Sequence, residues 1–215
     1  MKPVKNIIFD LGGVVIDLAR HRAISSLQAL GMEEAAVLLD EYEQKGPFLK
    51  LETGEFSSAD LYDTILPMCA PGTTTRDIRD AFEQFLVDLP VERLHLIEAL
   101  RNKGYKVFVL SNTNPIMYNH WIENAFRKDG KTINDYFDGI VASFQERTCK
   151  PDPQIFRNLV ERYHLNPEET LMLDDSAANC RAAESIGLNA IRVEKDGENS
   201  ITAIGARLLE SEVEK

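Results

Sequence analysis

The chain has 215 residues, of which 44% are hydrophobic and 27% charged, values that are ordinary for a globular protein with one sizeable core. Its net charge of −11 argues against sequence-independent binding of nucleic acid, which needs a basic surface. No apolar run approaches the roughly 20 residues of a membrane span, and the N-terminal residues carry no signal-peptide pattern. The three cysteines have no metal-type spacing, so we expect reduced thiols and a cytoplasmic protein without membrane association.

Five short apolar runs predict the strands of a parallel sheet. Each run is continuous and rich in branched or aromatic side chains, which is typical of strands buried on both faces. The predicted strands span Val4–Phe9, Tyr105–Leu110, Gly139–Ser143, Thr170–Leu173 and Asn189–Val193. Helical patterns between the later strands cover residues 90–104, 151–165 and 177–188. This alternation predicts an α/β fold with a doubly wound, Rossmann-like parallel sheet and helices on both faces.

Residues 17–89 interrupt the alternation, and we expect no strand in them. Amphipathic helical patterns punctuated by glycine cover residues 21–31, 32–46, 57–70 and 75–89. We therefore predict a Rossmann-like core of residues 1–16 and 90–215, and a small, all-helical cap of residues 17–89. The loop Lys50–Ser57, which holds one glycine and two acids, is a candidate to face a site from the cap.

Polar residues follow the predicted strands at the points where the strands end. Because the carboxyl ends of parallel strands meet at one edge of a sheet, we expect these side chains to converge. In chain order they are Asp10, Ser111, Asn112, Lys150, Asp174 and Asp175. Each motif alone also fits a turn or a helix cap, but their joint occurrence favours a catalytic site.

The chemistry that suits this set is phosphoryl transfer. A carboxylate such as Asp10 can attack phosphorus and form an aspartyl-phosphate. Clustered acids need a cation, and oxygen ligands from Asp10, Asp174 and Asp175 suit Mg²⁺. The Lys150 ammonium would balance charge on the nucleophile and on the transferring group. Asp10 and Lys150 are therefore the predicted catalytic residues.

A second group of residues is predicted to hold the phosphate. The Ser111 hydroxyl and nearby backbone N–H groups, including that of Asn112, can bind phosphate oxygens. Gly12 and Gly13 let the backbone turn tightly beside the phosphate, with no Cβ in the way.

These motifs resemble those of the haloacid dehalogenase (HAD) superfamily of hydrolases, and the resemblance covers nearly the whole chain. The four motifs of that family are resembled, in order, by IIFDLGGVV, VFVLSNTN, CKPDPQIF and LMLDDSAANCRAAESIGL. The resemblance implies Asp10 as nucleophile and Ser111 as phosphate binder. It also implies Asp174 and Asp175 as Mg²⁺ ligands, with the backbone carbonyl of Gly12 reaching the same metal.

The resemblance extends to the insert and to a subgroup of the family. The helical insert looks like the family's small cap, and the motifs are similar to those of a bacterial sugar-phosphatase group that includes α-glucose-1-phosphate phosphatases. In that group a basic residue stands at about the place of Arg22, which makes Arg22 our best cap candidate for contacting phosphate or a sugar hydroxyl. The alternative for Arg22 is a solvated first helical turn. Asn179 would orient metal-bound waters by resemblance, and a role in the first turn of its helix fits it equally well.

Gly12 departs from the family pattern, because most family phosphatases carry an aspartate two residues after the nucleophile. That aspartate is the general acid for the leaving group and the base for the attacking water, and losing such a group costs roughly 10² to 10⁴ in rate. Three interpretations stay open: a substrate with a good leaving group, a replacement group supplied by the cap, or a weak or silent phosphatase. The resembled sugar-phosphatase group includes members with the same gap, which favours the first two.

We therefore predict a Mg²⁺-dependent phosphomonoester hydrolase that acts on a small phosphate ester, such as a sugar phosphate, as a monomer or weak dimer. One alternative is a metal-independent 2-haloacid dehalogenase, because the family's dehalogenases also lack the second aspartate. The adjacent acids Asp174 and Asp175 argue against it, since without a cation they would be an uncompensated pair of like charges. The other alternative is a catalytically weak HAD-fold binding or regulatory protein.

Overall fold

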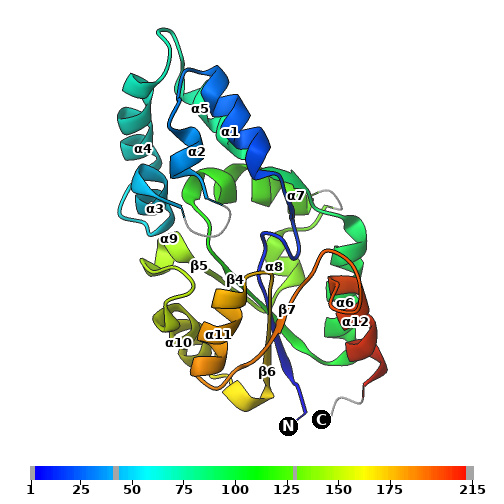
Figure 1. The fold of residues 1–215 in the computed structure, drawn as a ribbon. Coiled ribbons are helices and arrows are strands. Elements are labelled where there is room, and N and C mark those ends of the chain that lie inside the picture. The colour runs from blue at the N-terminus through cyan, green and yellow to red at the C-terminus, as the bar shows by residue number, and fades with distance from the viewer. Residues whose placement is uncertain (1–2, 41–43, 128–129, 212–215) are drawn as a thin grey trace.

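A five-stranded sheet with the order β5-β4-β1-β6-β7 organises the core (Figure 1). The structure is a computed structural model that describes residues 3–40, 44–127 and 130–211. All four strand pairings are parallel, which confirms the predicted doubly wound sheet. The strands are β1 (Asn6–Phe9), β4 (Lys106–Ser111), β5 (Gly139–Ala142), β6 (Thr170–Asp174) and β7 (Asn189–Arg192).

The alternation of side chains along β1 explains why helices cover both faces of the sheet. Ile8 points into one apolar cluster, which it shares with residues of α10 (Pro153–Arg162) and α11 (Ala177–Ser185). Ile7 and Phe9 point the opposite way, into a cluster that holds residues of α6 (Val91–Lys103) and α12 (Ile201–Glu210). All three β1 side chains have no exposed surface, so β1 is the buried centre of the core.

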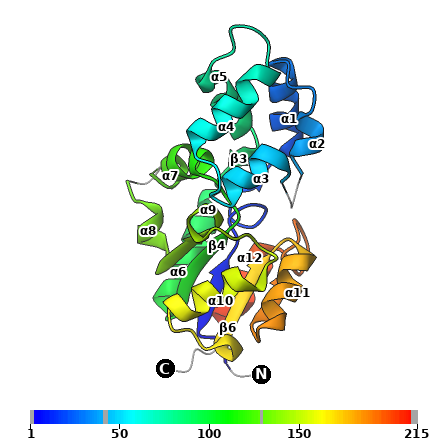
Figure 2. The same cartoon turned by 90° about the vertical axis from the view of Figure 1, so that its left-hand side faces the viewer.

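The insert forms a layer of helices at the end of the core opposite to the two chain termini (Figures 1 and 2). Its helices are α1 (Arg20–Ala29), α2 (Ala35–Leu38), α3 (Gly46–Glu52), α4 (Ser58–Ile65), α5 (Thr75–Glu83) and a 3₁₀ turn at Leu66–Met68. The core adds α7 (Glu123–Phe126), α8 (Ile133–Tyr136), α9 (Ser143–Glu146), a π-helical turn at Met117–Ile122 and a 3₁₀ turn at Pro167–Glu169. In the described part of the chain, no helix is long and apolar enough to cross a membrane.

The expectation of an insert without strands is wrong. Two short strands, β2 (Asp17–Leu18) and β3 (Leu86–Asp88), pair antiparallel at the base of the insert. Strands of this length carry no readable periodicity, and their partners are far apart in the sequence. The helix predicted over residues 75–89 consequently ends at Glu83. We call residues 17–89 the cap, and the division into core and cap stays a prediction.

Two further expectations about the cap differ from the structure. The pattern over residues 32–46 yields only the short helix α2, and residues 41–43 lie outside the described residues. The first part of the predicted loop Lys50–Ser57 belongs to α3 instead. Pro47 stands in the first turn of that helix, where its fixed φ is favourable, and Phe48 and Leu51 bury its inner face.

Close contacts join the cap to the core. Figure 2 shows the end of α3 beside α9. Gly54, with φ +68°, follows α3, and a Cβ there would lie 2.1 Å from the carbonyl oxygen of Phe144 in α9. Glu83 at the end of α5 contacts His120 Nδ1 at 2.8 Å, and Arg93 of α6 pairs with Asp17 of β2 at 2.8 Å. These contacts set the position of the cap above the carboxyl edge of the sheet.

We predict that Ile8→Ala lowers the free energy of unfolding by about 2–5 kcal/mol, because it opens a cavity between the sheet and the helices α10 and α11. Val37→Ala is the matched control, since Val37 is 68% exposed and should change the free energy of unfolding by only about 0.5 kcal/mol. Urea denaturation followed by circular dichroism measures both. A similar small effect of the two substitutions would contradict a buried β1.

Candidate active site

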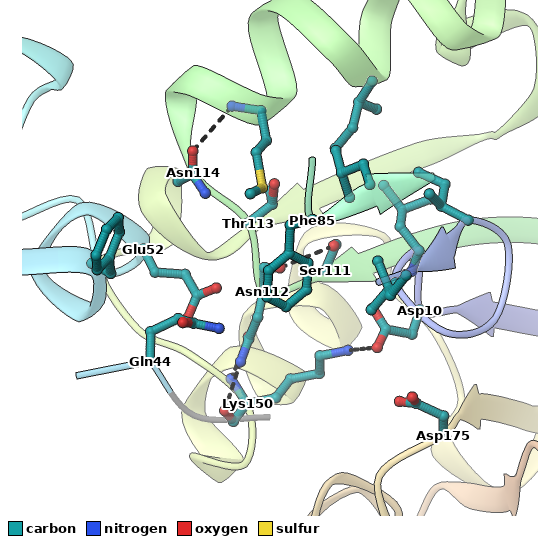
Figure 3. Close-up of a pocket in the computed structure, with 18 of the residues that line it drawn as sticks. Asp10, Gln44, Glu52, Phe85, Ser111, Asn112, Thr113, Asn114, Lys150 and Asp175 are labelled. Carbon is teal, nitrogen blue, oxygen red and sulfur yellow. Dashed lines mark hydrogen bonds and ion pairs between the residues drawn. The ribbon is translucent and has the colours of Figure 1, made fainter. Parts of the chain in front are cut away.

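The predicted site residues converge at the carboxyl edge of the sheet (Figure 3). Asp10 follows β1, Ser111 ends β4 and Asp174 ends β6, so three neighbouring strands each deliver a side chain to one place. Lys150 arrives on the loop after α9. Asp175 follows Asp174 and lines the same pocket as Asp10.

The Lys150 ammonium lies at the centre of the site. Its Nζ is 2.9 Å from Asp10 Oδ2 and donates a hydrogen bond of 2.7 Å to Asp174 Oδ2. Only 3% of Lys150 is exposed. Burial acts to lower the pKa of Lys150, but the charges of Asp10 and Asp174 outweigh burial and raise this pKa above its ordinary value. Lys150 therefore stays cationic inside the protein.

Asp10 lies in a strongly acidic surrounding. Burial raises the pKa of Asp10 well above its ordinary value, Lys150 opposes this shift, and the charges of Asp174 and Asp175 add to it. One lysine thus does not compensate three acids, and a second cation would be needed to hold all of them ionised.

The donor set fits a divalent cation. Asp10, Asp174 and Asp175 each offer a carboxylate oxygen, and these oxygens lie within 4.8 Å of one another. Ligand sets made only of oxygen suit Mg²⁺. Asp174 is further oriented through Oδ1, which accepts hydrogen bonds of 2.9 Å from Ser176 N and from Asn179 Nδ2. Asn179 thus stands in the first turn of α11 and also positions a candidate metal ligand.

The two glycines after the nucleophile differ in what they require. Gly13 has φ +74°, and a Cβ there would lie 2.1 Å from Asp175 Oδ2. A side chain at Gly13 would therefore displace a candidate metal ligand. At Gly12 the nearest atom to such a Cβ is Leu18 Cδ1, at 3.1 Å, which is the end of a flexible side chain. A side chain at Gly12 therefore requires the end of Leu18 to shift by a few tenths of an ångström.

The side chain of Asn112 has a structural role that the sequence did not indicate. Its amide forms two hydrogen bonds of 2.8 Å with the backbone of Lys150: Nδ2 donates to the Lys150 carbonyl, and Oδ1 accepts from the Lys150 N–H. The side chain therefore positions Lys150, and the binding of phosphate by the backbone N–H of Asn112 stays a prediction. Ser111 is buried, and its hydroxyl makes a long 3.4 Å contact to the Asn112 carbonyl.

Arg22 lies outside the site. It is exposed on α1 and does not line the pocket that holds Asp10. The helix buries Ala23 and Leu27 against the cap, which turns Arg22 toward solvent. The prediction that Arg22 contacts the substrate is therefore not supported, and the alternative of a solvated first turn fits its position.

The cap closes the site with an apolar wall and two polar side chains. The cavity between cap and core has a volume of about 90 Å³ open to the centres of water molecules. The apolar residues that line it from residues 17–89 are Leu18, Phe48, Phe82, Phe85 and Leu86. The polar residues that line it from the same segment are Gln44 and Glu52. The sequence predicted that the segment of Glu52 could face the site, because it holds two acids. No pattern in the sequence indicated Gln44.

Glu52 is a buried acid in an unusual setting. It is 8% exposed, and its carboxylate forms no hydrogen bond or ion pair within residues 3–40, 44–127 and 130–211. Burial raises the pKa of Glu52 to about 7, and the positive charge of Lys150 partly opposes the shift. A carboxyl group with such a pKa changes its protonation state near neutral pH.

The fold and the site together define an α/β protein with a Rossmann-like parallel sheet and an acidic, lysine-containing centre at the carboxyl edge of that sheet. Residues 4–187 match the family of haloacid dehalogenase-like hydrolases, and the chain belongs to this family.

Named relatives and solved structures that are similar to this chain support the family assignment. The chain is 34% identical to D-ribitol-5-phosphate phosphatase of Bacteroides thetaiotaomicron over 94% of this chain and 98% of that protein. A HAD family enzyme from the same organism, solved in complex with magnesium and inorganic phosphate, is 33% identical, with a TM-score of 0.83 over 90% of this chain and 96% of that one. A HAD-like hydrolase from Porphyromonas gingivalis is 35% identical, with a TM-score of 0.86 over 97% and 99%.

We predict that Glu52 makes the stability of the protein depend on pH. The folded-state pKa of about 7 exceeds the ordinary value of 4.5. Glu52 is therefore neutral in both states at low pH. Above about pH 4.5 it ionises in the unfolded state while the folded state keeps it protonated, so the folded state loses relative stability until the pH passes about 7. Relative to Glu52→Gln, the wild type should lose stability on the order of 3 kcal/mol between about pH 4.5 and pH 8.

Urea unfolding of both proteins at several pH values measures this difference. Glu55→Gln, at an exposed acid three residues away, should alter the free energy of unfolding by about 0.5 kcal/mol or less. A wild-type and Glu52→Gln difference that stays constant with pH would contradict the raised pKa.

Proposed function

We propose that this chain is a Mg²⁺-dependent phosphomonoester hydrolase that works through an aspartyl-phosphate on Asp10. The observation that carries the proposal is the buried cluster in which Lys150 joins Asp10 to Asp174, with Asp175 beside them. Two relatives support it: one is a named phosphatase, and the other holds magnesium and inorganic phosphate.

The site residues divide the work of the reaction among them. A carboxylate oxygen of Asp10 attacks phosphorus, and the bond to the leaving oxygen breaks. Lys150, 2.9 Å from Asp10, orients the nucleophile and offsets charge on the transferring group. The Ser111 hydroxyl can turn to donate to a phosphate oxygen. Mg²⁺ held by Asp10, Asp174 and Asp175, with the Gly12 carbonyl as a further predicted ligand, would neutralise phosphate oxygens.

The two earlier alternatives have less support than the phosphatase. A metal-independent dehalogenase would leave the cluster of Asp10, Asp174 and Asp175 without the divalent cation that its three carboxylates fit. A binding protein without catalysis would not need a nucleophile in contact with a buried lysine.

The substrate we propose is a small sugar or polyol phosphate. Gln44 Oε1 is a buried acceptor in the pocket with no hydrogen-bond partner among the described residues, and a substrate hydroxyl would satisfy it. The relative named for D-ribitol 5-phosphate supports this class of substrate. The monomeric or weakly dimeric state and the cytoplasmic location stay predictions.

We predict that Asp10→Asn lowers turnover of ribitol 5-phosphate by at least about 10³-fold, because an amide oxygen is a poor nucleophile. Release of inorganic phosphate measures activity, and circular dichroism checks that the fold is kept. Wild-type turnover by the variant would refute the aspartyl-phosphate mechanism.

We predict that Asp175→Ala abolishes the stimulation of activity by Mg²⁺, because the cluster loses one of its three acids. Titration of Mg²⁺ against phosphate release, for the variant and for the wild type, tests this. An unchanged Mg²⁺ dependence would show that Asp175 does not hold the metal.

A further inference from the structure

The proposed reaction lacks a proton donor on the core. A departing alcohol leaves as an alkoxide unless it receives a proton, and a water that attacks the phosphoenzyme must lose one. The residue two positions after the nucleophile is Gly12, which has no side chain to serve either need. The donor must come from another part of the pocket.

We propose that Glu52, at the end of cap helix α3, is the general acid and base of this enzyme. This assignment rests on the proposed phosphatase function and names the residue that replaces the missing carboxylate.

The position of Glu52 fits the role. Glu52 lines the same pocket as Asp10, Ser111 and Lys150. Figure 3 shows Glu52 and Gln44 on one side of this pocket, with Asp10 and Asp175 on the opposite side. In an in-line displacement the leaving oxygen points away from the attacking nucleophile. The leaving oxygen of an ester attacked by Asp10 therefore faces the cap side, where Glu52 lies.

The cap holds Glu52 firmly at this place. Its helix α3 is anchored by Phe48, whose ring centroid lies 4.8 Å from that of Phe82 in α5. The turn after the helix is pressed against the core, because Gly54 leaves no room for a Cβ beside the Phe144 carbonyl. A general acid needs such fixed placement, since misplacement by about 1 Å is costly in rate.

The protonation state of Glu52 also suits the role. The positive charge of Lys150 lowers the pKa of Glu52. In the other direction, burial and the charge of Glu52 raise the pKa of the Cys149 thiol. Burial outweighs Lys150 and leaves the pKa at about 7. An acid with this pKa can both release and accept a proton near neutral pH.

The other titratable residues that line the described pocket already have different roles in the site. Lys150 is bound to two carboxylates, and its raised pKa opposes release of a proton. Asp10 is the nucleophile, and Asp175 belongs to the acidic cluster. Glu52 is the carboxyl group that remains.

The two steps balance as follows. An Asp10 oxygen forms a bond to phosphorus, the ester P–O bond breaks toward the leaving oxygen, and the Glu52 proton moves to that oxygen. Water then attacks the phosphoenzyme and passes a proton to the Glu52 carboxylate. The bond between phosphorus and Asp10 breaks, phosphate leaves, and both carboxyl groups return to their starting states.

The experiment compares two small substrates with different needs for a proton. Ribitol 5-phosphate has an alcohol leaving group that needs the acid, whereas acetyl phosphate releases acetate, which is stable as an anion. For Glu52→Gln we expect phosphoenzyme formation from ribitol 5-phosphate to slow by about 10² to 10⁴. The first burst of acetate from acetyl phosphate should keep its wild-type rate, followed by slow turnover because the second step lacks its base. Glu55→Gln, on the same segment, should behave as wild type.

A second variant tests for rescue. Because a Cβ at Gly12 would meet the flexible end of Leu18 and no backbone atom within 4 Å among its nearest contacts, Gly12→Asp added to Glu52→Gln should recover at least about tenfold of the lost turnover of ribitol 5-phosphate. No recovery would count against the assignment.

The outcomes separate this assignment from the proposed function. An equal loss on both substrates in the first step would overturn the role of Glu52, because it would indicate binding or folding instead. Undiminished turnover of ribitol 5-phosphate by Glu52→Gln would overturn it as well. Absence of Mg²⁺-dependent turnover of either substrate by the wild type would instead overturn the proposed function and, with it, the premise of this assignment.

Discussion

The buried Lys150 ammonium between Asp10 and Asp174 is the interaction on which the rest of the site depends. It links the end of β1 to the end of β6, and the Asn112 amide ties its backbone to the end of β4. Removing these charges from water is costly, and the short ion pairs and the hydrogen bonds donated by Leu11, Ser176 and Asn179 offset that cost. Three strands therefore meet at one charged centre, which leaves an excess of negative charge for a cation to neutralise.

The core and its site could be read from the sequence because the relevant signals are local. Apolar runs define β1, β4, β5, β6 and β7, and the rules of parallel sheets bring their carboxyl ends together. The side-chain role of Asn112 could not be predicted from the sequence, since its hydrogen-bond partners lie on the backbone of Lys150, 38 residues away. The pairing of β2 with β3 likewise depends on tertiary structure, because neither strand is long enough to show a pattern.

The cap was the least predictable part, because its contribution depends on which way each side chain points. Arg22 was predicted to contact the substrate, but Ala23 and Leu27 form the buried face of α1 and Arg22 lies on the exposed face. Glu52 was indicated only as one of two acids in a loop, and its burial follows from the packing of Phe48 and Leu51 in α3. Together with the phenylalanines of the wall, this packing keeps water from the site, which strengthens every charge interaction inside it.

The attachment of the cap has a consequence for how this protein responds to stress. The nucleophile stands on the centre of the sheet, whereas Glu52 stands on a layer joined to it by the short ribbon of β2 and β3, the Glu83–His120 contact, the close fit of Gly54 and one apolar cluster that runs through cap and core. Because this cluster is shared, opening the cap would also expose apolar side chains of the core. Heat or denaturant would thus remove activity together with the fold, and not by opening of the cap above an intact sheet.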